Sequence, residues 1–315
     1  MKYYAGIDLG GTFIKCGIID EEGKLIAKDK IPTEKENGFQ YIANKMSDLA
    51  LSLANKMNVK LHGIGIGSPG TVNSQKGVIV YSNNLDWDNV PLAELIKQRI
   101  NLPVKVTNDA NAAAIGEQFC GAGKEYSDMI LITLGTGVGS GIVIEGKLFE
   151  GYRSAGAEIG HSVIHVGGEK CTCGRRGCFE AYASATALIR QTRRAMERNH
   201  NSAMWRLCDR LENVNGRTAF DGLRDGDKTA KRVVNTYIRY LAEGIANLCN
   251  EFRPQAVLLG GGICAEGDTL LRPLKKLVNE RLFGGTKYAP VQLLTASLGN
   301  DAGVYGAARL VMVSC

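Results

Sequence analysis

The sequence lacks a long apolar run. No stretch approaches the roughly 18 apolar residues of a membrane-spanning helix, and the first apolar segment meets an acid at Asp8. Nothing at the N-terminus has the pattern of an export signal. We therefore expect a cytoplasmic protein without a membrane anchor.

Two familiar phosphate-binding fingerprints are also missing. No Gly-x-x-x-x-Gly-Lys-[Ser/Thr] motif occurs, so a P-loop is excluded. The glycines of 8–12 (Asp-Leu-Gly-Gly-Thr) follow a predicted strand, but they lack the Gly-x-Gly-x-x-Gly spacing and lead into a second strand. A dinucleotide fold needs a helix at that point, so a Rossmann site is excluded as well.

The excess of positive over negative charge is confined to one region. The chain has 315 residues, 44% of them hydrophobic, and 38 basic against 32 acidic side chains give a net charge of +6. This length and composition exclude disorder and predict one large or two medium domains. Residues 190–239 hold 12 basic and 6 acidic side chains and so account for the whole excess. Solvated faces of arginine-rich helices explain such a patch more simply than nucleic acid or membrane binding, and we expect neither partner.

Two glycine-punctuated segments, 7–25 and 132–148, resemble each other and indicate a duplication. Each predicts a strand, a glycine turn and a returning strand, Phe13–Asp20 in one copy and Ser140–Glu145 in the other. Further strands are predicted at Gly63–Gly67, Val104–Val106, Ala256–Leu259 and Val291–Leu294, and helices at Asp109–Gln118, Thr269–Arg281 and Ala302–Val311. This alternation predicts an α/β fold of two duplicated domains with mixed sheets. Residues 187–250 have helical periodicity and no strand signal, which predicts a helical insertion.

The two glycine turns are candidate phosphate sites. Backbone N–H groups of Gly10-Gly11-Thr12 and Gly135-Thr136-Gly137 are suited to cradle phosphate, and Asp8 beside the first turn is suited to hold Mg²⁺ through water. Alternatively, the glycines only close tight hairpins. A third cluster, 260–262, ends a predicted strand and would let a flat ligand such as adenine approach the backbone, or simply form a turn.

One imidazole and three thiols lie within 18 residues: His161, Cys171, Cys173 and Cys178. A Cys₃His set predicts tetrahedral Zn²⁺, and four protein ligands leave no open position, so the metal would be structural. Free thiols are the alternative, and His165 is a weaker fourth ligand. Glu158 and Glu180 flank this loop and are candidate polyol contacts.

A candidate base follows the strand at Val104–Val106. Asn108 and Asp109 stand where this strand meets an alanine-rich helix, a position typical of ligand-binding residues in open α/β sheets. A carboxylate there is suited to take the proton of an attacking hydroxyl, with Asn108 orienting the acceptor. From local sequence alone, Asp109 is equally well explained as a helix N-cap.

Together these motifs resemble the ROK (repressor, open reading frame, kinase) family over nearly the whole chain, and most of all its bacterial glucokinases. The resemblance implies an actin-like, hexokinase-type (ribonuclease H-like) fold with a ligand cleft between its domains, which we expect at 1–120 with 299–315 and at 121–298. It implies ATP-dependent phosphorylation of glucose at O6, with Asp109 as base and zinc on His161 and the three cysteines. The implied sugar contacts are Gly70, Asn84 (or Asn83), Asn108, Asp109, Glu158, His161 and Glu180. We expect ATP and Mg²⁺ at Asp8, Gly10, Gly11, Thr12, Lys15, Gly135, Thr136, Gly137, Gly260, Gly261 and Gly262.

Several alternatives stay open. An N-acetylmannosamine, N-acetylglucosamine or other hexose kinase of the same family would use the same contacts, and polyphosphate is an alternative to ATP. A DNA-binding regulator would need a helix-turn-helix before the strand that begins at Tyr3, where we expect no room for one. A filament-forming actin-like protein is disfavoured by the zinc loop. The resemblance suggests a homodimer.

Overall fold

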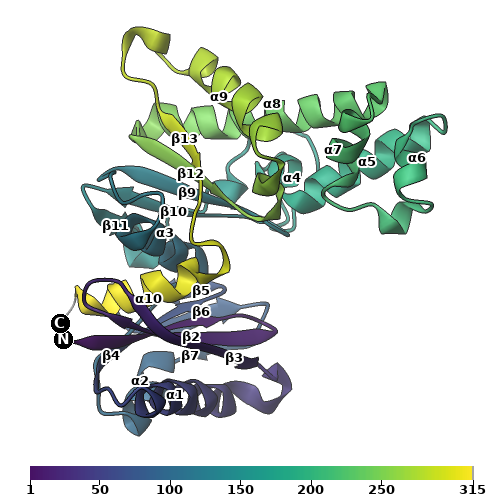
Figure 1. The fold of residues 1–315 in the computed structure, drawn as a ribbon. Coiled ribbons are helices and arrows are strands. Elements are labelled where there is room, and N and C mark those ends of the chain that lie inside the picture. Colours follow the sequence, from purple (N-terminus) through teal and green to yellow (C-terminus); the bar gives the residue numbers. More distant parts are fainter. Residues whose placement is uncertain (314–315) are drawn as a thin grey trace. The chain divides into compact units, whose positions relative to one another are not determined.

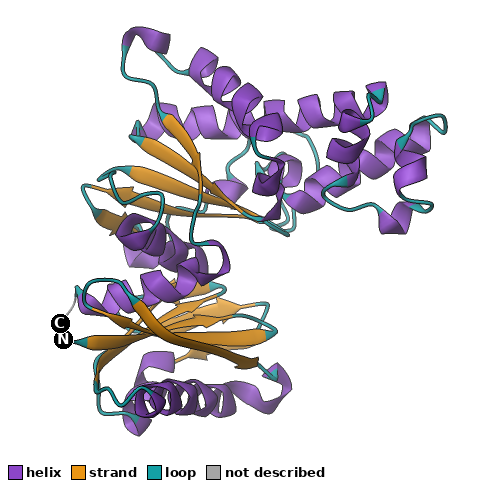
Figure 2. Cartoon of the chain, in the orientation of Figure 1, coloured by secondary structure: helices purple, strands orange, loops and turns teal. Residues whose placement is uncertain are grey.

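The computed structural model describes residues 1–313 and has two five-stranded mixed sheets of the same topology. The first has the order β3-β2-β1-β4-β8 and the second β11-β10-β9-β12-β13, drawn as orange arrows in Figure 2. Their strands are β1 Tyr3–Leu9, β2 Phe13–Asp20, β3 Leu25–Pro32, β4 Leu61–Ser68 and β8 Val104–Asn108, then β9 Met129–Leu134, β10 Val138–Ile144, β11 Lys147–Phe149, β12 Ala256–Gly260 and β13 Gln292–Thr295. The equivalent strand orders confirm the predicted duplication and the mixed α/β class.

The register of the first sheet gathers its polar residues at one edge. β1 pairs with β2 in antiparallel and with β4 in parallel fashion, and β4 pairs in parallel with β8. Asp8 is therefore level with Gly67, and Gly67 with Thr107. Because parallel strands end on the same side, the sheet itself brings the end of β1 next to the start of the helix that follows β8.

A third sheet of short strands was not predicted from the sequence. It has the order β5-β6-β7 and comprises Thr71–Asn73, Val78–Ser82 and Trp87–Val90. Strands of three to five residues give too few alternations for a period-2 signal. Gly70 directly precedes β5, and Asn84 lies in the turn between β6 and β7.

Helices form in all the segments where they were predicted, and α1 Gly38–Lys56, α2 Leu92–Arg99 and α4 Glu180–Ala183 form in addition. The others are α3 Asp109–Cys120, α5 Ala185–Arg198, α6 Met204–Leu207, α7 Thr218–Arg224, α8 Lys228–Phe252, α9 Asp268–Arg281 and α10 Ala302–Met312. Short 3₁₀ segments occur at Lys35–Asn37, Tyr152–Ser154, Ile159–His161, Leu211–Asn213, Gly262–Glu266, Gly285–Lys287 and Gly299–Asp301. Helices α5 to α8 occupy the region 187–250 without a strand, which confirms the helical insertion (Figure 1).

The chain divides into two units. Of the described residues, the first comprises 1–131, 141–157 and 296–313, and the second 132–140 and 158–295. Within residues 1–313, no helix combines the length and the apolar composition that crossing a bilayer requires.

In the first unit, α1 and α10 lie on opposite faces of the first sheet (Figure 1). Helix α10 reaches the sheet backbone because glycines leave no side chain between them. A Cβ atom on Gly65 of β4 would lie 1.6 Å from the Ala307 carbonyl oxygen, and one on Gly6 of β1 would lie 2.0 Å from that of Val304. The C-terminal helix is therefore a fixed layer of the first unit.

Helix α3 is anchored at its far end by a buried carboxylate. Glu117 accepts hydrogen bonds from the backbone N–H groups of Ala122 at 2.9 Å, Ser297 at 3.1 Å and Leu298 at 2.8 Å. These bonds join α3 to the segment that enters α10, so the C-terminal end of the helix that begins at Asp109 is held in place.

The glycine contact gives a stability prediction. Gly65→Ala forces the α10 carbonyl away from the sheet, and we expect it to lower the unfolding free energy by at least about 2 kcal/mol in urea denaturation. Gly216→Ala is the matched control, because no atom lies within 4 Å of the added methyl. Its effect should stay below about 0.5 kcal/mol. Equal effects of the two substitutions would contradict the close packing of α10.

Candidate functional site

Asn108, and not Asp109, is the N-cap of α3. Its Oδ1 accepts from the N–H groups of Ala110 at 2.9 Å and Asn111 at 3.3 Å, and its backbone is extended, as an N-cap requires. Its Nδ2 donates to the Gly70 carbonyl at 3.0 Å. The alternative explanation of Asp109 as an N-cap is therefore wrong, and Asn108 fixes the position of Asp109 at the first helical residue.

Asp109 does not act as the helix cap. Its Oδ1 accepts from the Ala110 N–H at 2.9 Å, and the Asn108 side chain and the Asp109 N–H also interact with its carboxyl. Asp109 is exposed to solvent at its surface, but the protein atoms packed around its carboxyl desolvate it and raise its pKa to about 6; the Ala110 N–H opposes this rise, and the charge of Asp8 adds to it. A carboxylate with that pKa is ionised at neutral pH and still basic enough to accept a proton.

The predicted sugar-side residues Gly70 and Asn84 lie in the same unit. Gly70 has φ +103°, and a Cβ atom there would lie 2.2 Å from the Tyr81 carbonyl, so only glycine fits. Asn84 is exposed, and its carbonyl would lie 3.4 Å from a Cβ on Gly11. The sequence left open whether Asn83 or Asn84 contacts the sugar. In the structure, the backbone of Asn84 lies beside the first glycine turn.

The first glycine turn carries a charged pair. The Lys15 ammonium donates to Asp8 Oδ2 at 2.9 Å and to the Asn300 carbonyl at 3.2 Å. The Gly10 N–H donates to the Phe13 carbonyl at 2.9 Å, which closes the hairpin, and Thr12 is exposed. The turn therefore places a carboxylate, which suits Mg²⁺, next to an ammonium group, which suits phosphate oxygens.

In the second unit, the second glycine turn meets both the third glycine cluster and Glu180. A Cβ atom on Gly261, whose φ is +103°, would lie 2.1 Å from the Leu134 carbonyl, directly before Gly135. A Cβ atom on Gly137 would lie 2.3 Å from Glu180 Oε2. Gly260, Gly261 and Gly262 thus end β12 beside the exposed Gly135 and Thr136. Three segments that are distant in sequence converge here.

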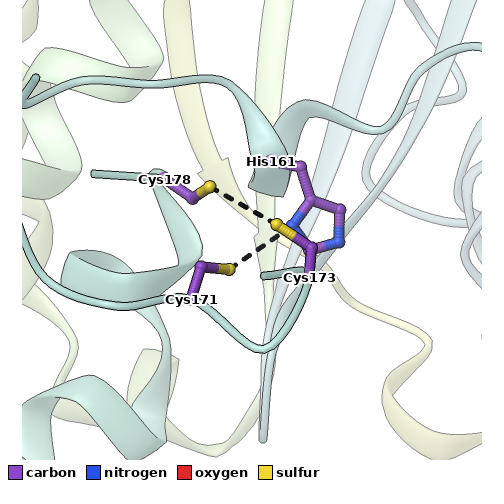
Figure 3. A group of neighbouring side chains, drawn as sticks. All are labelled: His161, Cys171, Cys173 and Cys178. Atoms are coloured by element: carbon purple, nitrogen blue, oxygen red, sulfur yellow. Dashed lines mark hydrogen bonds between the residues drawn. The ribbon is translucent and has the colours of Figure 1, made fainter. Parts of the chain in front are cut away.

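The four candidate zinc ligands form one cluster. The ligand atoms of His161, Cys171, Cys173 and Cys178 all lie within 4.8 Å of one another. His161 Nδ1 lies 3.6 Å from Cys171 Sγ, and Cys173 Sγ lies 3.7 Å from Cys178 Sγ (Figure 3). Three thiols and an imidazole in this arrangement fit tetrahedral Zn²⁺. Because Nδ1 faces the sulfur atoms, Nε2 of His161 is left for a second task.

The two flanking carboxylates differ in their partners. Glu180 Oε2 accepts from the Val138 N–H at 3.1 Å, and Oε1 accepts from the Thr172 hydroxyl at 2.8 Å. Glu158 is exposed, and its side chain has no hydrogen-bond or ion-pair partner among residues 1–313; its carbonyl accepts from the His161 N–H at 3.1 Å. Glu180 is therefore held rigidly against the loop, whereas Glu158 is free to bind a ligand.

The remaining histidines and thiols have ordinary surroundings. His165 Nδ1 lies 3.2 Å from the Tyr182 hydroxyl and is not part of the cluster of four. Burial raises the pKa of Cys16 and Cys249 to about 12 and that of Cys264 to about 11, so these thiols are unreactive. Cys315 lies outside the described residues.

Sequence reasoning missed a polar network beside the candidate base. Glu150 accepts from the Thr107 hydroxyl at 3.0 Å and from the Ser74 hydroxyl at 2.6 Å. Ser74 Oγ also lies 2.8 Å from Ser154 Oγ. Thr107 is 43 residues from Glu150 and Ser74 is 76 residues away, so no local motif could have revealed the contacts. The network fixes the end of β8, and with it the residues that follow.

Comparisons with known proteins agree with this arrangement. The ROK family model matches residues 4–313. The glucokinase of Thermotoga maritima is 36% identical over 310 residues, covering 97% of this chain and 96% of that protein. The glucokinase of Halalkalibacterium halodurans is 38% identical over 318 residues, covering 98% and 95%. The crystal structure of a ROK family glucokinase from Streptomyces griseus, in complex with glucose and AMPPNP, is 36% identical and superimposes with a TM-score of 0.81 over 98% of this chain and 99% of that one.

The cluster of four predicts metal in the purified protein. We expect about one zinc per chain by inductively coupled plasma mass spectrometry. The double substitution Cys171→Ser and Cys173→Ser should remove most of it, because two hydroxyls replace two thiolates. Cys120→Ser, a half-buried thiol outside the cluster, is the control and should keep the wild-type content. Wild-type protein with well below one zinc per chain would refute the site.

Proposed function

Because the chain belongs to the ROK family, we propose that it is a glucokinase that transfers the γ-phosphoryl group of ATP to O6 of glucose. The observation that carries this proposal is the combination of Asp109, free of capping and with a raised pKa, with a chain-long similarity to proteins named glucokinase. These relatives support phosphorylation of a sugar. Glucose as the substrate, O6 as the accepting atom and ATP as the phosphoryl donor are part of the proposal.

Asp109 is assigned the role of general base. As the bond between O6 and the γ-phosphorus forms, the hydroxyl proton passes to the Asp109 carboxylate, and ADP leaves when the bond between the γ-phosphorus and its bridging oxygen breaks. Asn108 holds this carboxylate in place through the cap, and its amide is also assigned to the sugar. Gly70, Asn84, Glu158, His161 and Glu180 complete the assigned sugar contacts.

The nucleotide is assigned to the glycine turns. Backbone N–H groups of Gly11, Thr12, Thr136 and Gly137 are suited to phosphate oxygens. Gly10 and Gly135 are assigned to the shape of the two turns, because their N–H groups donate to the Phe13 and Gly137 carbonyls. Gly260, Gly261 and Gly262 are assigned to the adenine side. Asp8 would hold Mg²⁺, which would neutralise charge on the phosphates. The ammonium of Lys15, now paired with Asp8, would serve the same phosphates.

Zn²⁺ is assigned a structural role. His161, Cys171, Cys173 and Cys178 would hold it, and a closed tetrahedral site supplies rigidity and no open position for chemistry. The ring of His161 would then present Nε2 to a sugar hydroxyl, and α4, which begins at Glu180, would be fixed at the end of the loop.

The remaining assignments concern the whole molecule. We infer a domain division at 1–120 with 299–315 and at 121–298, a homodimer and a cytoplasmic location. An N-acetylhexosamine kinase is the nearest alternative, because Glu158, His161 and Glu180 suit either sugar. A sugar-responsive regulator is not favoured, since the relatives at 36–38% identity are named glucokinase over almost the full chain.

Removing the carboxylate tests the base. Asp109→Ala should lower kcat by at least about 10²-fold, because no other group replaces the proton acceptor, while AMPPNP affinity stays near the wild-type value. Asp48→Ala removes an exposed carboxylate of α1 that pairs with Arg99, and it should leave kcat unchanged. Near-normal kcat in Asp109→Ala would rule out this role.

The pKa of Asp109 predicts the pH dependence. A general base must be deprotonated, so kcat/KM should be constant above about pH 7 and should fall about tenfold per pH unit well below 6. The residual activity of Asp109→Asn should lack this inflection. An inflection near pH 4 in the wild type would show that the carboxyl is not perturbed in the free enzyme.

A substrate panel tests the proposed function as a whole. ADP release should be measured with glucose, N-acetylmannosamine, N-acetylglucosamine, mannose, allose and fructose, and we expect the highest kcat/KM with glucose. A different best hexose would overturn the glucose assignment. Absence of ADP release with every sugar, from zinc-containing protein, would overturn the kinase assignment.

A further inference from the structure

The second unit contains a cavity that the proposed function does not use. It has a volume of about 520 Å³ and is formed mainly by α5 and α8, with Glu169 and Tyr182 at one side; we call it the α5–α8 cavity. None of the residues assigned above to sugar, nucleotide or zinc lines it. Its volume lies within the range of about 300–1,000 Å³ that is typical of small-molecule sites.

The lining of the cavity is strongly basic. Arg190, Arg194, Arg198 and Arg232 line it together with a single acid, Glu169. The carboxylate of Glu169 binds Arg194 through both oxygens and lies 3.9 Å from Arg190 Nε. One carboxylate therefore faces four guanidinium groups, and the cavity carries a surplus of positive charge that attracts anions.

Two of these arginines have no acidic partner. Within the described part of the chain, the Arg198 side chain makes no hydrogen bond or ion pair, and that of Arg232 donates only to the Thr229 hydroxyl, at 3.4 Å. The carboxylate of Glu197, next along α5, does not line the cavity. Guanidinium groups bind phosphate oxygens in pairs of parallel hydrogen bonds, so Arg198 and Arg232 offer uncommitted phosphate donors.

The cavity residues also include buried polar atoms without partners. Arg190 Nε, a donor, and Gln191 Oε1, an acceptor, have no hydrogen bond within residues 1–313. Native proteins rarely leave such atoms unsatisfied. A ligand that satisfies both must carry an accepting oxygen and a donating hydroxyl. The ring of Tyr240, tilted by 39° against that of Tyr182 with their centroids 4.4 Å apart, adds an apolar surface beside them.

We propose that the α5–α8 cavity binds a phosphate group carried by a small polyhydroxylated molecule, that is, a sugar phosphate or a compound of the same chemistry. The phosphate would lie against Arg198 and Arg232, and the hydroxyls would reach Gln191. The product of the reaction proposed above belongs to this class, and that link alone rests on the proposed function.

The cavity shares a wall with the zinc loop. The Glu169 N–H donates to the Tyr182 hydroxyl at 2.7 Å, Gln191 Nε2 donates to the Tyr182 carbonyl at 2.9 Å, and Arg190 donates to the Ala181 carbonyl. Both carbonyls belong to α4, whose first residue is Glu180. An anion that draws Arg190 or Arg194 away from Glu169 therefore acts on the helix that carries a proposed sugar contact.

Binding is tested by titration calorimetry on the full, zinc-containing chain, with AMPPNP and glucose present to occupy the proposed active site. Glucose 6-phosphate should bind saturably. The double variant Arg198→Gln and Arg232→Gln should bind it at least about tenfold more weakly, since charge-assisted hydrogen bonds are lost. The double variant Arg206→Gln and Arg210→Gln, with the same charge change on exposed residues outside the cavity, should match the wild type within about twofold.

Inorganic phosphate in place of the ester identifies the source of the phosphate. Weaker binding of inorganic phosphate by about tenfold or more assigns the cavity to the ester, and equal binding assigns it to free phosphate. Equal affinities in the two double variants, or no saturable binding to the wild type, would overturn the proposal. So would sedimentation showing that Arg198→Gln with Arg232→Gln dissociates an oligomer, because the cavity would then be a subunit contact. Calorimetry and sedimentation need no turnover. A negative result in either is therefore distinguishable from a negative result in the kinase assay.

The link to the zinc loop is tested by kinetics. Inorganic phosphate should change the KM for glucose by at least about threefold in the wild type and in Arg206→Gln with Arg210→Gln, but not in Arg198→Gln with Arg232→Gln. A KM that does not respond to phosphate in the wild type would refute the coupling.

Discussion

The hydrogen bonds from the first turn of α3 to the Asn108 side chain are the interaction on which the account of the site depends. A helix N-terminus needs an acceptor, and an aspartate next to it would ordinarily serve. Because Asn108 supplies that acceptor, the Asp109 carboxylate does not serve as the cap and accepts from the Ala110 N–H. Desolvation then raises its pKa to about 6, although the backbone N–H groups of Ala110 and Asp109 and the Asn108 side chain lower it. The chemistry of the aspartate thus follows from the identity of the residue before it.

The surrounding packing keeps this arrangement in place. Gly65 and Gly6 let α10 lie directly on the sheet, and the buried Glu117 binds the segment before α10 to the end of α3. In the second unit, side chains hold the zinc loop in place. Its four candidate ligand atoms lie within 4.8 Å of one another, and Glu180 accepts hydrogen bonds from Val138 and Thr172. The first unit is fixed by close backbone packing, and the loop of the second by a cluster of metal-binding side chains.

Much of the fold could be predicted from the sequence, because the duplicated hairpins at 7–25 and 132–148 repeat within one chain and the strand and helix periods are clear. The zinc ligands could be predicted because they lie within 18 residues. The sheet β5-β6-β7 could not, since its strands are too short for a periodic signal. The role of Asn108 as the cap, the Glu150 network and the α5–α8 cavity depend on contacts between segments or on which side chain satisfies a given donor, and neither is local information.

The central claim is that the carboxylate of Asp109 is not the cap of α3 and has a raised pKa in the folded protein. Its pKa can be measured directly by following the ¹³Cγ resonances of labelled aspartate from pH 4 to pH 8 in the free protein, with Asp109→Asn identifying the signal. The account predicts a midpoint near 6 for the resonance that this substitution removes. A midpoint near 4, the value of an unperturbed aspartate, would contradict it.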